Sequence, residues 1–363
     1  MNGVFWNPVE VNFGAGCLAR LPGILGSRRA VVVTFAEAAQ IGLTQRVRDL
    51  CGERVVAVID DVQPNPDVTH VAGLYRDFWR KHESCPVIVA IGGGSVLDTA
   101  KTLMVGTHSN EFDELLDLLD TGRPFTPPRA KSLITVPTTS GTGSEVTPWA
   151  TIWDRTIRQR KYSLQLPQTW PEAAIVDPDL TLSLPHSVTV QSGLDALSHA
   201  LEAIWNVNAN PISDEFAVSA ARDMLATLPA LVANPRDRAL REQASLAALK
   251  AGLAFSNTKT ALAHSISYEM TIHHGLPHGI ACSFTLPMVL ELALGKNAAR
   301  DAVLAKVFPC PLSEARTYLT GFLEALGVRT SFSSYGVSAE ESDRMIAHAL
   351  SGPRGRNFIA ATA

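Results

Sequence analysis

Hydrophobic patterning divides this chain into two parts of different character. Up to about Pro185, helical stretches alternate with short apolar runs rich in β-branched residues, which are "AVVVTF" (30–35), "RVVAVI" (54–59), "PVIVAI" (86–91) and "SLITVP" (132–137). Runs of this length, bounded by turns or helices, are typical of strands buried on both faces of a parallel sheet. The alternation therefore predicts a doubly wound α/β domain over residues 1–185.

After "DPDLTLSLP" (177–185) the strand-like runs stop and helical patterns dominate. The clearest of them are "GLDALSHALEAIW" (193–205), "SDEFAVSAARDMLATL" (213–228), "ALREQASLAALKAGLAF" (239–255) and "EARTYLTGFLEALG" (314–327). We therefore expect residues 186–363 to form an all-helical second domain. We expect the tail "SGPRGRNFIAATA" (351–363) to be loosely held.

Composition excludes several classes of protein. The 363 residues are 46% hydrophobic and 18% charged, and the net charge of -4 gives no basic excess for nucleic acid. No apolar run reaches the roughly 18 residues of a membrane span, and the N-terminus lacks a signal-peptide pattern. Five scattered cysteines without a CxxC pair indicate reduced thiols in a cytoplasmic protein. We expect a homo-oligomer, a dimer, with no nucleic-acid or membrane partner.

Three consecutive glycines follow the third apolar run, in "IGGGSVLDTAK" (91–101), and lead into a helix at Ser95. Glycine lets a phosphate approach the backbone closely, and a helix N-terminus offers N–H groups and a positive dipole end. The loop has neither the GxGxxG pattern nor the GK[ST] ending of a P-loop. A phosphate site and a tight strand-to-helix turn both stay open from this loop alone.

A second small-residue loop, "PTTSGTGSEVTP" (137–148), follows the next apolar run. Its hydroxyl groups could donate hydrogen bonds to phosphate or ribose oxygens; they belong to Thr138, Thr139, Ser140, Thr142 and Ser144. A polar surface loop would have a similar composition. Because ligands of open α/β sheets gather at the carboxyl ends of the strands, the two loops together favour a dinucleotide.

Histidine is concentrated in "HSISYEMTIHHGLPHG" (264–279), which holds four of the ten histidines. Upstream, "GLDALSHALE" places Asp195 and His199 four residues apart, on one face of a helix, where both side chains can reach one ion. Together with His264 and His278 they would offer three nitrogens and one oxygen, a set that suits Fe²⁺ or Zn²⁺. A local hydrogen bond, a core histidine or a capping histidine would explain each residue separately.

Taken in order, these motifs resemble the iron-containing (group III) alcohol dehydrogenases, whose fold is shared with dehydroquinate synthase and glycerol dehydrogenase. The resemblance rests on "FGAG", "DVQPNP", "GGGSVLDTAK", "PTTSGTGSEVT", "VDP" and "GLDALSHALE", followed by His264 and "PHG". It implies a Rossmann-like domain that binds the pyrophosphate of NAD or NADP at Gly92, Gly93, Gly94, Ser95 and Asp98. It also implies a "TTSGTGSE" loop near the nicotinamide and a metal, Fe²⁺ or Zn²⁺, held by Asp195, His199, His264 and His278.

The implied chemistry is hydride transfer in a cleft where the two sites meet. A divalent metal ion would polarise a carbonyl oxygen, and the reduced nicotinamide would deliver hydride to the carbonyl carbon. No protein nucleophile is needed for this reaction. We therefore expect an oxidoreductase that interconverts a small aldehyde and its primary alcohol.

The chain departs from the family pattern at two positions. Many members carry a histidine, thought to assist proton relay, one turn after the position of His264, where this chain has Tyr268. Either Tyr268, a neighbouring histidine such as His274, or water completes the relay here, or the relay differs. Many NAD-dependent members also have an acidic residue at the position of Phe35, and its loss weakens rejection of the NADP 2′-phosphate. Glu37 is close in sequence, and the choice between NAD and NADP stays open.

Two segments, "SISYEMTIHHGLPHGIACS" and "GPRGRNF", look most like the branch of this family associated with phosphonate metabolism. That branch includes phosphonoacetaldehyde reductases, which make 2-hydroxyethylphosphonate. A phosphonate dianion would want a cationic partner, ideally an arginine. The candidates, which solvated surface charge would also explain, are Arg158, Arg160, Lys161, Arg354 and Arg356. We expect at least one of them to reach the cleft near the metal.

Three other functions stay open. The first is an alcohol or diol dehydrogenase for an uncharged short-chain alcohol. The second is a dehydroquinate synthase-like lyase, which would use NAD without net oxidation of the cofactor. The third is a nucleotide-binding protein that has lost catalysis and has no need of a metal ion. The sequence leaves the native metal and the direction of the reaction open as well.

Overall fold

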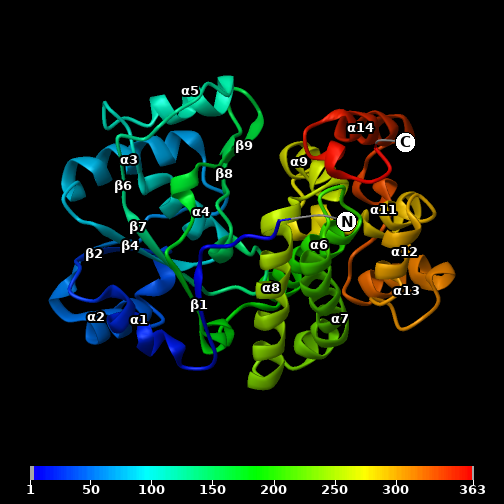
Figure 1. The fold of residues 1–363 in the computed structure, drawn as a ribbon, viewed down its shortest axis with the longest axis horizontal. Helices are drawn as coiled ribbons and strands as arrows, with labels where there is room; N and C mark the ends of the chain where they lie inside the picture. Colours follow the sequence, from blue (N-terminus) through cyan, green and yellow to red (C-terminus); the bar gives the residue numbers. More distant parts are fainter. Residues whose placement is uncertain (1–3, 362–363) are drawn as a thin grey trace. The chain divides into compact units, whose positions relative to one another are not determined.

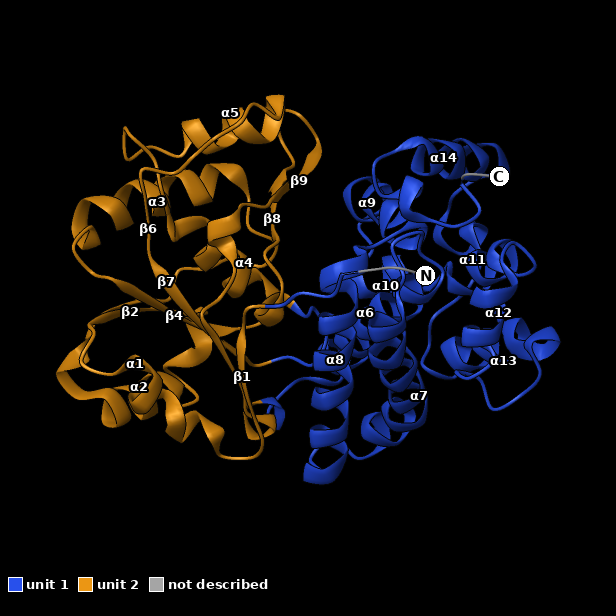
Figure 2. Ribbon diagram, viewed as in Figure 1, with its two compact units in different colours: residues 1–7, 139–143, 181–363 blue, residues 8–138, 144–180 orange. Residues whose placement is uncertain are grey.

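The computed structural model describes residues 4–361, and the chain divides into two compact units (Figures 1 and 2). A sheet unit comprises residues 8–138 and 144–180, and a helical unit comprises the segment up to Asn7, residues 139–143 and the chain from Thr181 onward. The sequence placed the boundary at Pro185, in the loop before the first long helix. Patterning gave no sign that 139–143 packs with the helical unit.

A six-stranded parallel sheet forms the centre of the sheet unit, in the strand order β1-β10-β7-β4-β2-β3. Its strands are β1 (Glu10–Phe13), β2 (Ala30–Val33), β3 (Val55–Ile59), β4 (Val87–Gly92), β7 (Ser132–Pro137) and β10 (Ala173–Val176). The four apolar runs of the sequence correspond to β2, β3, β4 and β7. The predicted fold class, a doubly wound α/β part followed by an all-helical part, is confirmed.

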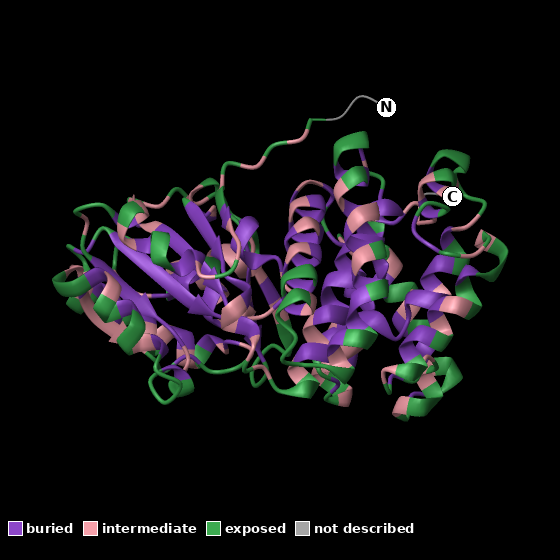
Figure 3. Ribbon diagram, turned by 90° about the horizontal axis from the view of Figure 1, so that it is seen from below, coloured by how far each residue is buried: buried purple, intermediate pink, exposed green. Residues whose placement is uncertain are grey.

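Helices cover both faces of this sheet because its strands are apolar on both sides. In β4, Ile88 and Ala90 face a core shared with α3 and α4, whereas Val87, Val89 and Ile91 face a second core shared with α1 and α2. Figure 3 shows the sheet strands as the buried centre of the unit. The helices are α1 (Leu21–Leu25), α2 (Leu43–Cys51), α3 (Val68–His82), α4 (Gly94–Leu103) and α5 (Asp113–Thr121).

Two short antiparallel pairs lie outside the main sheet. They are β5 (Val105–Gly106) with β6 (Arg129–Ala130), and β8 (Ala150–Asp154) with β9 (Arg160–Leu164). The second pair follows the loop at 137–148 directly. The sequence predicted none of these strands.

The helical unit is built around α6, which is buried over most of its length. Its helices are α6 (His186–Ile204), α7 (Pro211–Ala233), α8 (Arg238–Thr258), α9 (Leu262–His274), α10 (His278–Ser283), α11 (Leu286–Ala293), α12 (Ala298–Leu304), α13 (Leu312–Ala325) and α14 (Ala339–Ser351). Helices α7, α8 and α10 pack against α6. Because α6 is enclosed in this way, polar side chains on it lie inside the unit and need partners there.

Among the described residues, α7 is the one helix long and apolar enough to cross a membrane by length and composition. In this fold its Ala217, Ala221 and Leu228 are buried in the core that also contains α6 and α8. Such packing is that of a core helix.

The expectation of a loosely held tail is wrong for its described part, residues 351–361. Phe358 is fully buried and forms a β-bridge with Asn206. The backbone N–H of Ile359 donates to the carbonyl of Trp205. The tail, including the short 3-10 turn Gly355–Asn357, is therefore part of the helical core.

Candidate active site

Helix α6 carries a carboxylate and an imidazole into the middle of the helical unit. Asp195 and His199 lie one turn apart and are both buried. The Nε2 atom of His199 is 3.8 Å from Oδ1 of Asp195. The ring of His199 stacks on Phe255 of α8, with ring centroids 4.0 Å apart, and this contact holds the imidazole in its orientation.

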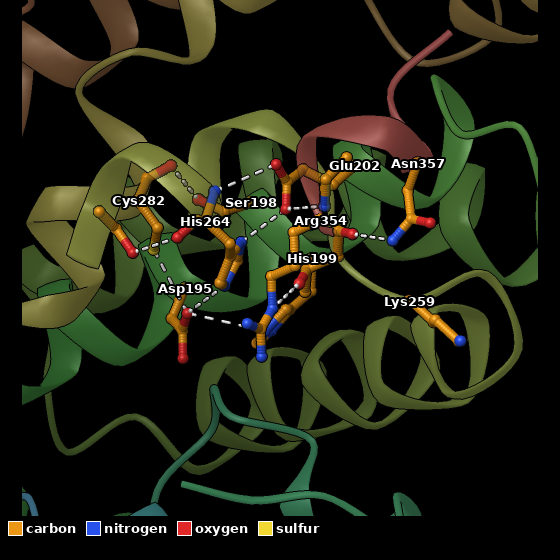
Figure 4. Close-up of polar contacts among 12 residues, drawn as sticks. Asp195, Ser198, His199, Glu202, Lys259, His264, Cys282, Arg354 and Asn357 are labelled. Atoms are coloured by element: carbon orange, nitrogen blue, oxygen red, sulfur yellow. Dashed lines mark hydrogen bonds and ion pairs between the residues drawn. The ribbon is translucent and has the colours of Figure 1, made fainter. Parts of the chain in front are cut away.

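Two further histidines converge on the same carboxylate oxygen (Figure 4 shows Asp195, His199 and His264). Nε2 of His264, from α9, lies 3.3 Å from Oδ1 of Asp195, and Nε2 of His278, the first residue of α10, lies 3.8 Å from it. Ligand atoms that share a tetrahedral ion at about 2.1 Å are about 3.4 Å apart. Asp195, His264 and His278 belong to a group whose ligand atoms all lie within 4.8 Å of one another, whereas His199 lies close to Asp195 but outside that group.

The protonation of His264 tests whether this group fits a cation. Its Nδ1 lies 2.6 Å from a carboxylate oxygen of Glu202 and so carries the ring proton, which leaves a lone pair on Nε2. Nε2 is buried and has no hydrogen-bond partner within residues 4–361, although Oδ1 of Asp195 is 3.3 Å away. Two buried acceptors this close repel each other unless positive charge lies between them. The arrangement fits a divalent metal ion.

The pKa values of Asp195 and His199 point the same way. Burial raises the pKa of Asp195, but the surrounding histidines outweigh burial and hold it well below the usual range. Burial lowers the pKa of His199 to about 4, so this imidazole is neutral at physiological pH. Burial also lowers the pKa of His264, yet Glu202 and Asp195 raise it overall. An ionised carboxylate and a neutral imidazole are the forms that bind a metal.

Cys282 is a neighbour of this group that the sequence analysis missed. It is fully buried, and its Sγ lies 3.3 Å from Oδ1 of Asp195. With Asp195, His264 and His278 it offers ligand atoms that all lie within 4.8 Å of one another. The signal was present, because His278 and Cys282 have the same i, i+4 spacing as Asp195 and His199. Burial raises the pKa of the Cys282 thiol well above its usual value, so the thiol donates to Asp195.

Comparison with known families decides the identity of this chain. The sequence model for "iron-containing alcohol dehydrogenase" matches residues 8–178, and that for the C-terminal part of the same family matches residues 189–362. The chain belongs to the iron-containing alcohol dehydrogenase family. It is therefore an NAD(P)-dependent, metal-containing oxidoreductase, and the lyase alternative does not hold.

Relatives of this alcohol dehydrogenase differ in substrate and cofactor. It is 32% identical to the NAD-dependent methanol dehydrogenase of Bacillus methanolicus, over 90% of this chain and 87% of the relative. It is 28% identical to the NADPH-dependent butanol dehydrogenase of Clostridium saccharobutylicum, over 98% and 94% of the two chains. The structure of sulfoacetaldehyde reductase from Bifidobacterium kashiwanohense in complex with NAD⁺ superposes with a TM-score of 0.89, at 29% identity, over 100% and 97%.

In this alcohol dehydrogenase, the first glycine loop lies where β4 ends and α4 begins. Gly92 leaves no room for a side chain, because a Cβ atom there would lie 2.5 Å from Cγ2 of Val96. Gly93 precedes the helix in an extended conformation, and Gly94 is its first residue. The hydroxyl of Ser95 accepts a hydrogen bond from the backbone N–H of Asn65, in the "DVQPNP" motif. The loop thus ends on a helix N-terminus, as an anion site requires.

The second loop is divided between the units. Thr138 donates its backbone N–H to Gly92 and belongs to the sheet unit, whereas residues 139–143 belong to the helical unit. There the hydroxyl of Ser140 lies 2.9 Å from that of Ser245 on α8. Thr139 and Thr142 are half-buried.

Glycines bring residues 139–143 into contact with α6 and α8. A Cβ atom on Gly141 would lie 2.6 Å from the backbone oxygen of Ser192, and one on Gly143 would lie 2.6 Å from Cα of Gly252. The backbone of Gly141 also acts on His199, whose pKa it raises against the stronger effect of burial. The loop expected near the nicotinamide therefore lies against the helix that carries Asp195 and His199.

Two residues expected to contact the cofactor, Asp98 and Ser144, are hydrogen-bonded to each other inside the sheet unit. One oxygen of Asp98 accepts from the hydroxyl of Ser144, and the other accepts from the backbone N–H of Thr151. The buried ammonium of Lys101 donates to the hydroxyl and carbonyl of Ser144 and to the carbonyl of Trp149. Asp98 and Ser144 thus tie helix α4 to the second loop, a role in which they position the loops.

The two candidates for a proton relay have different surroundings. Tyr268 lies one turn after His264 on α9, and burial raises the pKa of its phenol to about 12, so it stays protonated at physiological pH. His274 is the last residue of α9, and its Nε2 lies 3.2 Å from the carboxylate of Glu341 on α14.

Of the five candidate cations, three lie in the β8–β9 region of the sheet unit. Arg158 pairs with Asp120 and Asp154, Arg160 is exposed, and Lys161 lies over the ring of Trp153. The other two lie in the tail. Arg356 is exposed, whereas Arg354 is half-buried beside α9, the helix that carries His264.

Proposed function

We propose that this protein is an NAD(P)H-dependent, metal-containing reductase of a short aldehyde that carries an anionic head group, with phosphonoacetaldehyde as the substrate and 2-hydroxyethylphosphonate as the product. Asp195, His199, His264 and His278 hold the metal, and the first glycine loop holds the cofactor pyrophosphate. A homodimer and a cytoplasmic location stay predictions from the sequence.

The observation that carries the proposal is the position of Arg354. Its guanidinium lies 4.8 Å from the ring centroid of Tyr268, which follows His264 by one helical turn. Its Nε donates to the hydroxyl of Thr260, just before α9 begins. A guanidinium has five N–H groups in a rigid fork, and such a fork suits the oxygens of a phosphonate or sulfonate. A cation held over the ring of a residue that lies one turn from a proposed metal ligand can bind the far end of a short aldehyde.

The structural relative with sulfoacetaldehyde as its named substrate supports the same class. Sulfoacetaldehyde is a two-carbon aldehyde with a tetrahedral anionic group, as phosphonoacetaldehyde is. At 29% identity and a TM-score of 0.89 over the whole chain, that reductase is a close match in fold. A sulfonate is therefore the first alternative head group to test.

The side chains of the chain supply binding and orientation. With both groups bound, the metal ion would polarise the carbonyl oxygen and the nicotinamide would transfer hydride. Asp195 and the three histidines would hold the metal ion in place. Phe255 stacks on His199 and keeps that imidazole in the orientation of a ligand. The ring of Tyr268 makes a cation–π contact with the guanidinium of Arg354 and so helps to position this cation.

A second candidate is an alcohol dehydrogenase for an uncharged short-chain alcohol. The identity of 32% to a methanol dehydrogenase favours it, because that value is slightly higher than the identity to the sulfoacetaldehyde reductase. In that case Arg354 would only anchor the tail on α9.

The test compares Arg354→Ala with Arg356→Ala, a matched control two residues away on the exposed side of the tail. Activity is assayed with phosphonoacetaldehyde, sulfoacetaldehyde and propanal, using NADH and NADPH, with Fe²⁺ and Zn²⁺ supplied separately. Loss of a charge-assisted hydrogen bond, roughly 1.5–3 kcal/mol, predicts a fall of about 10- to 100-fold in kcat/KM for the anionic aldehyde in Arg354→Ala. Propanal should be affected far less, and Arg356→Ala should resemble the wild type. An unchanged ratio of anionic to neutral substrate in Arg354→Ala would favour the second candidate.

A further inference from the structure

We propose that Glu202 is a positioning residue for the metal, which fixes the tautomer of His264 and supplies the second negative charge beside the ion. The inference rests on the metal site proposed above and adds a residue to it.

Glu202 lies on α6, the helix of Asp195 and His199, and is fully buried. Its carboxylate makes three short contacts, all with the first residues of α9 or the residue before them (Figure 4). Oε2 accepts from the backbone N–H of Ala261 at 3.0 Å and lies 2.6 Å from Nδ1 of His264. Oε1 accepts from the backbone N–H of His264 at 3.2 Å. The carboxylate therefore forms hydrogen bonds with both the backbone and the ring of His264.

The ring contact determines which nitrogen of His264 is available. A carboxylate only accepts hydrogen bonds, so Nδ1 has to donate, and in the neutral imidazole that binds a metal Nε2 then keeps its lone pair. That lone pair is the one that faces Asp195. Ligand histidines of metal sites commonly have a carboxylate or carbonyl partner of this kind, which also makes the imidazole a stronger ligand.

Charge gives an independent reason for a carboxylate at this place. A divalent ion bound by Asp195 and three neutral imidazoles would leave one net positive charge buried in the helical unit. Glu202 brings a second negative charge and makes the buried group neutral overall, which lowers the cost of removing it from water. An uncharged side chain of the same size would leave this imbalance.

A purely structural role is the competing explanation. The side chain of Ala261, the N-cap residue of α9, cannot cap the helix. Glu202 accepts hydrogen bonds from the backbone N–H groups of Ala261 and His264 and could serve as the cap in its place. As a cap alone, Glu202 would contribute to the stability of the fold and leave the properties of the bound metal unchanged. Metal affinity and the electronic spectrum of the bound ion distinguish the two roles.

The experiment strips the protein of metal and titrates it with Co²⁺ and Zn²⁺ against a chelating dye. In Glu202→Gln we expect about 10- to 100-fold weaker binding of both ions and a changed visible spectrum of the Co²⁺ form. Asp214→Asn is the control, because Asp214 is a buried acid of the same unit that pairs with Arg300 instead of a histidine. It should lower thermal stability and leave the affinity and spectrum of the folded protein unchanged.

His264→Ala separates failure of this inference from failure of the metal site. If His264→Ala binds the ions as tightly as the wild type, the metal site itself is wrong. If His264→Ala loses binding while Glu202→Gln keeps wild-type affinity and spectrum, only the role of Glu202 is wrong. If Glu202→Gln does not fold, Glu202→Asp takes its place, since it keeps the charge but is one methylene too short to keep the contact. Weakened binding supports the inference, and wild-type binding overturns it.

Discussion

A Cβ atom on Gly279 would lie 1.9 Å from the backbone oxygen of Gln191. Gly279, the second residue of α10, is therefore in direct backbone contact with Gln191 of α6, which lies one turn before Asp195. The glycine of the "PHG" motif is the only residue type that permits this approach, since every other one carries a Cβ atom. The contact sets the distance between His278 and the carboxylate of Asp195.

Replacing Gly279 with alanine should force α10 away from α6. We expect the metal content of the purified protein to fall to a small fraction of one ion per chain, and activity to fall with it. Elemental analysis measures the first quantity. Gly275→Ala is a useful comparison, because Gly275 has a positive φ of 68° but open space around its missing side chain. It should strain the backbone and leave the ion in place. Full metal occupancy in Gly279→Ala would count against this account.

Replacing Gly93 with valine should weaken cofactor binding and leave the metal site intact. The backbone of Gly93 is extended, so a valine fits its φ and ψ, but its side chain would project where α4 begins. We expect the KM for NAD(P)H to rise at least about tenfold, or about 1.4 kcal/mol, with unchanged metal content. Gly92 is unsuitable for the same test because it contacts Val96. Equal cofactor affinity in Gly93→Val and wild type would rule out a pyrophosphate site at this loop.

Replacing Phe35 with aspartate should shift cofactor preference toward NADH. Phe35 follows β2 and precedes the short turn Ala36–Ala38. A carboxylate there would accept from the ribose hydroxyl and repel the 2′-phosphate of NADPH. We expect the ratio of kcat/KM for NADH to that for NADPH to rise about tenfold or more. Phe35→Asn, similar in shape but uncharged, should change the ratio far less; the same ratio in both variants would exclude a charge effect.

The buried carboxyl of Glu145 should make the stability of the sheet unit fall as the pH rises toward 7. Burial raises its pKa to about 7, against the effect of the Lys101 ammonium. The folded state then holds a proton that the unfolded state releases at about 4.5, so this contribution to stability is present below about pH 4.5 and is lost as the pH rises to about 7. Relative to Glu145→Gln, the wild type should lose roughly 2–3 kcal/mol of unfolding free energy between pH 5 and pH 7.5. Urea unfolding measures the difference. If the unfolding free energies of the wild type and Glu145→Gln changed with pH in parallel, the prediction would be wrong. The control is Glu37→Gln, a change of an exposed glutamate, which should follow the wild type.

The sequence was most informative where one side chain pattern decides the structure. The β-branched runs of β2 and β4 are buried on both faces, and this burial is what their composition predicts. Strands β1 and β10 have only four residues each, and "EVNF" and "AAIV" become strands because they pair with each other and with β7. Such pairing is a property of the folded sheet.

The same limit applies to the candidate site. The spacing of Asp195 and His199 placed both on one helical face, and the structure brings His264 and His278 to them. Glu202 contacts His264 across 62 positions of the chain, so no local pattern could connect the two. Asp98 was assigned to the cofactor by resemblance, and in the structure one of its oxygens accepts from Ser144 of the second loop and the other from Thr151 of β8.

The membership of residues 139–143 in the helical unit limits how this enzyme can be divided or recombined. A fragment that ends near Leu180 would carry these five residues without the helices they pack on, and a fragment that starts at Thr181 would leave Ser192 and Gly252 uncovered. A chimera that takes the helical unit from a relative would have to take residues 139–143 from the same relative. Otherwise positions 192 and 252 would have to keep small residues. Residues 139–143 thus pack with the helical unit, although in the sequence they lie between two segments of the sheet unit.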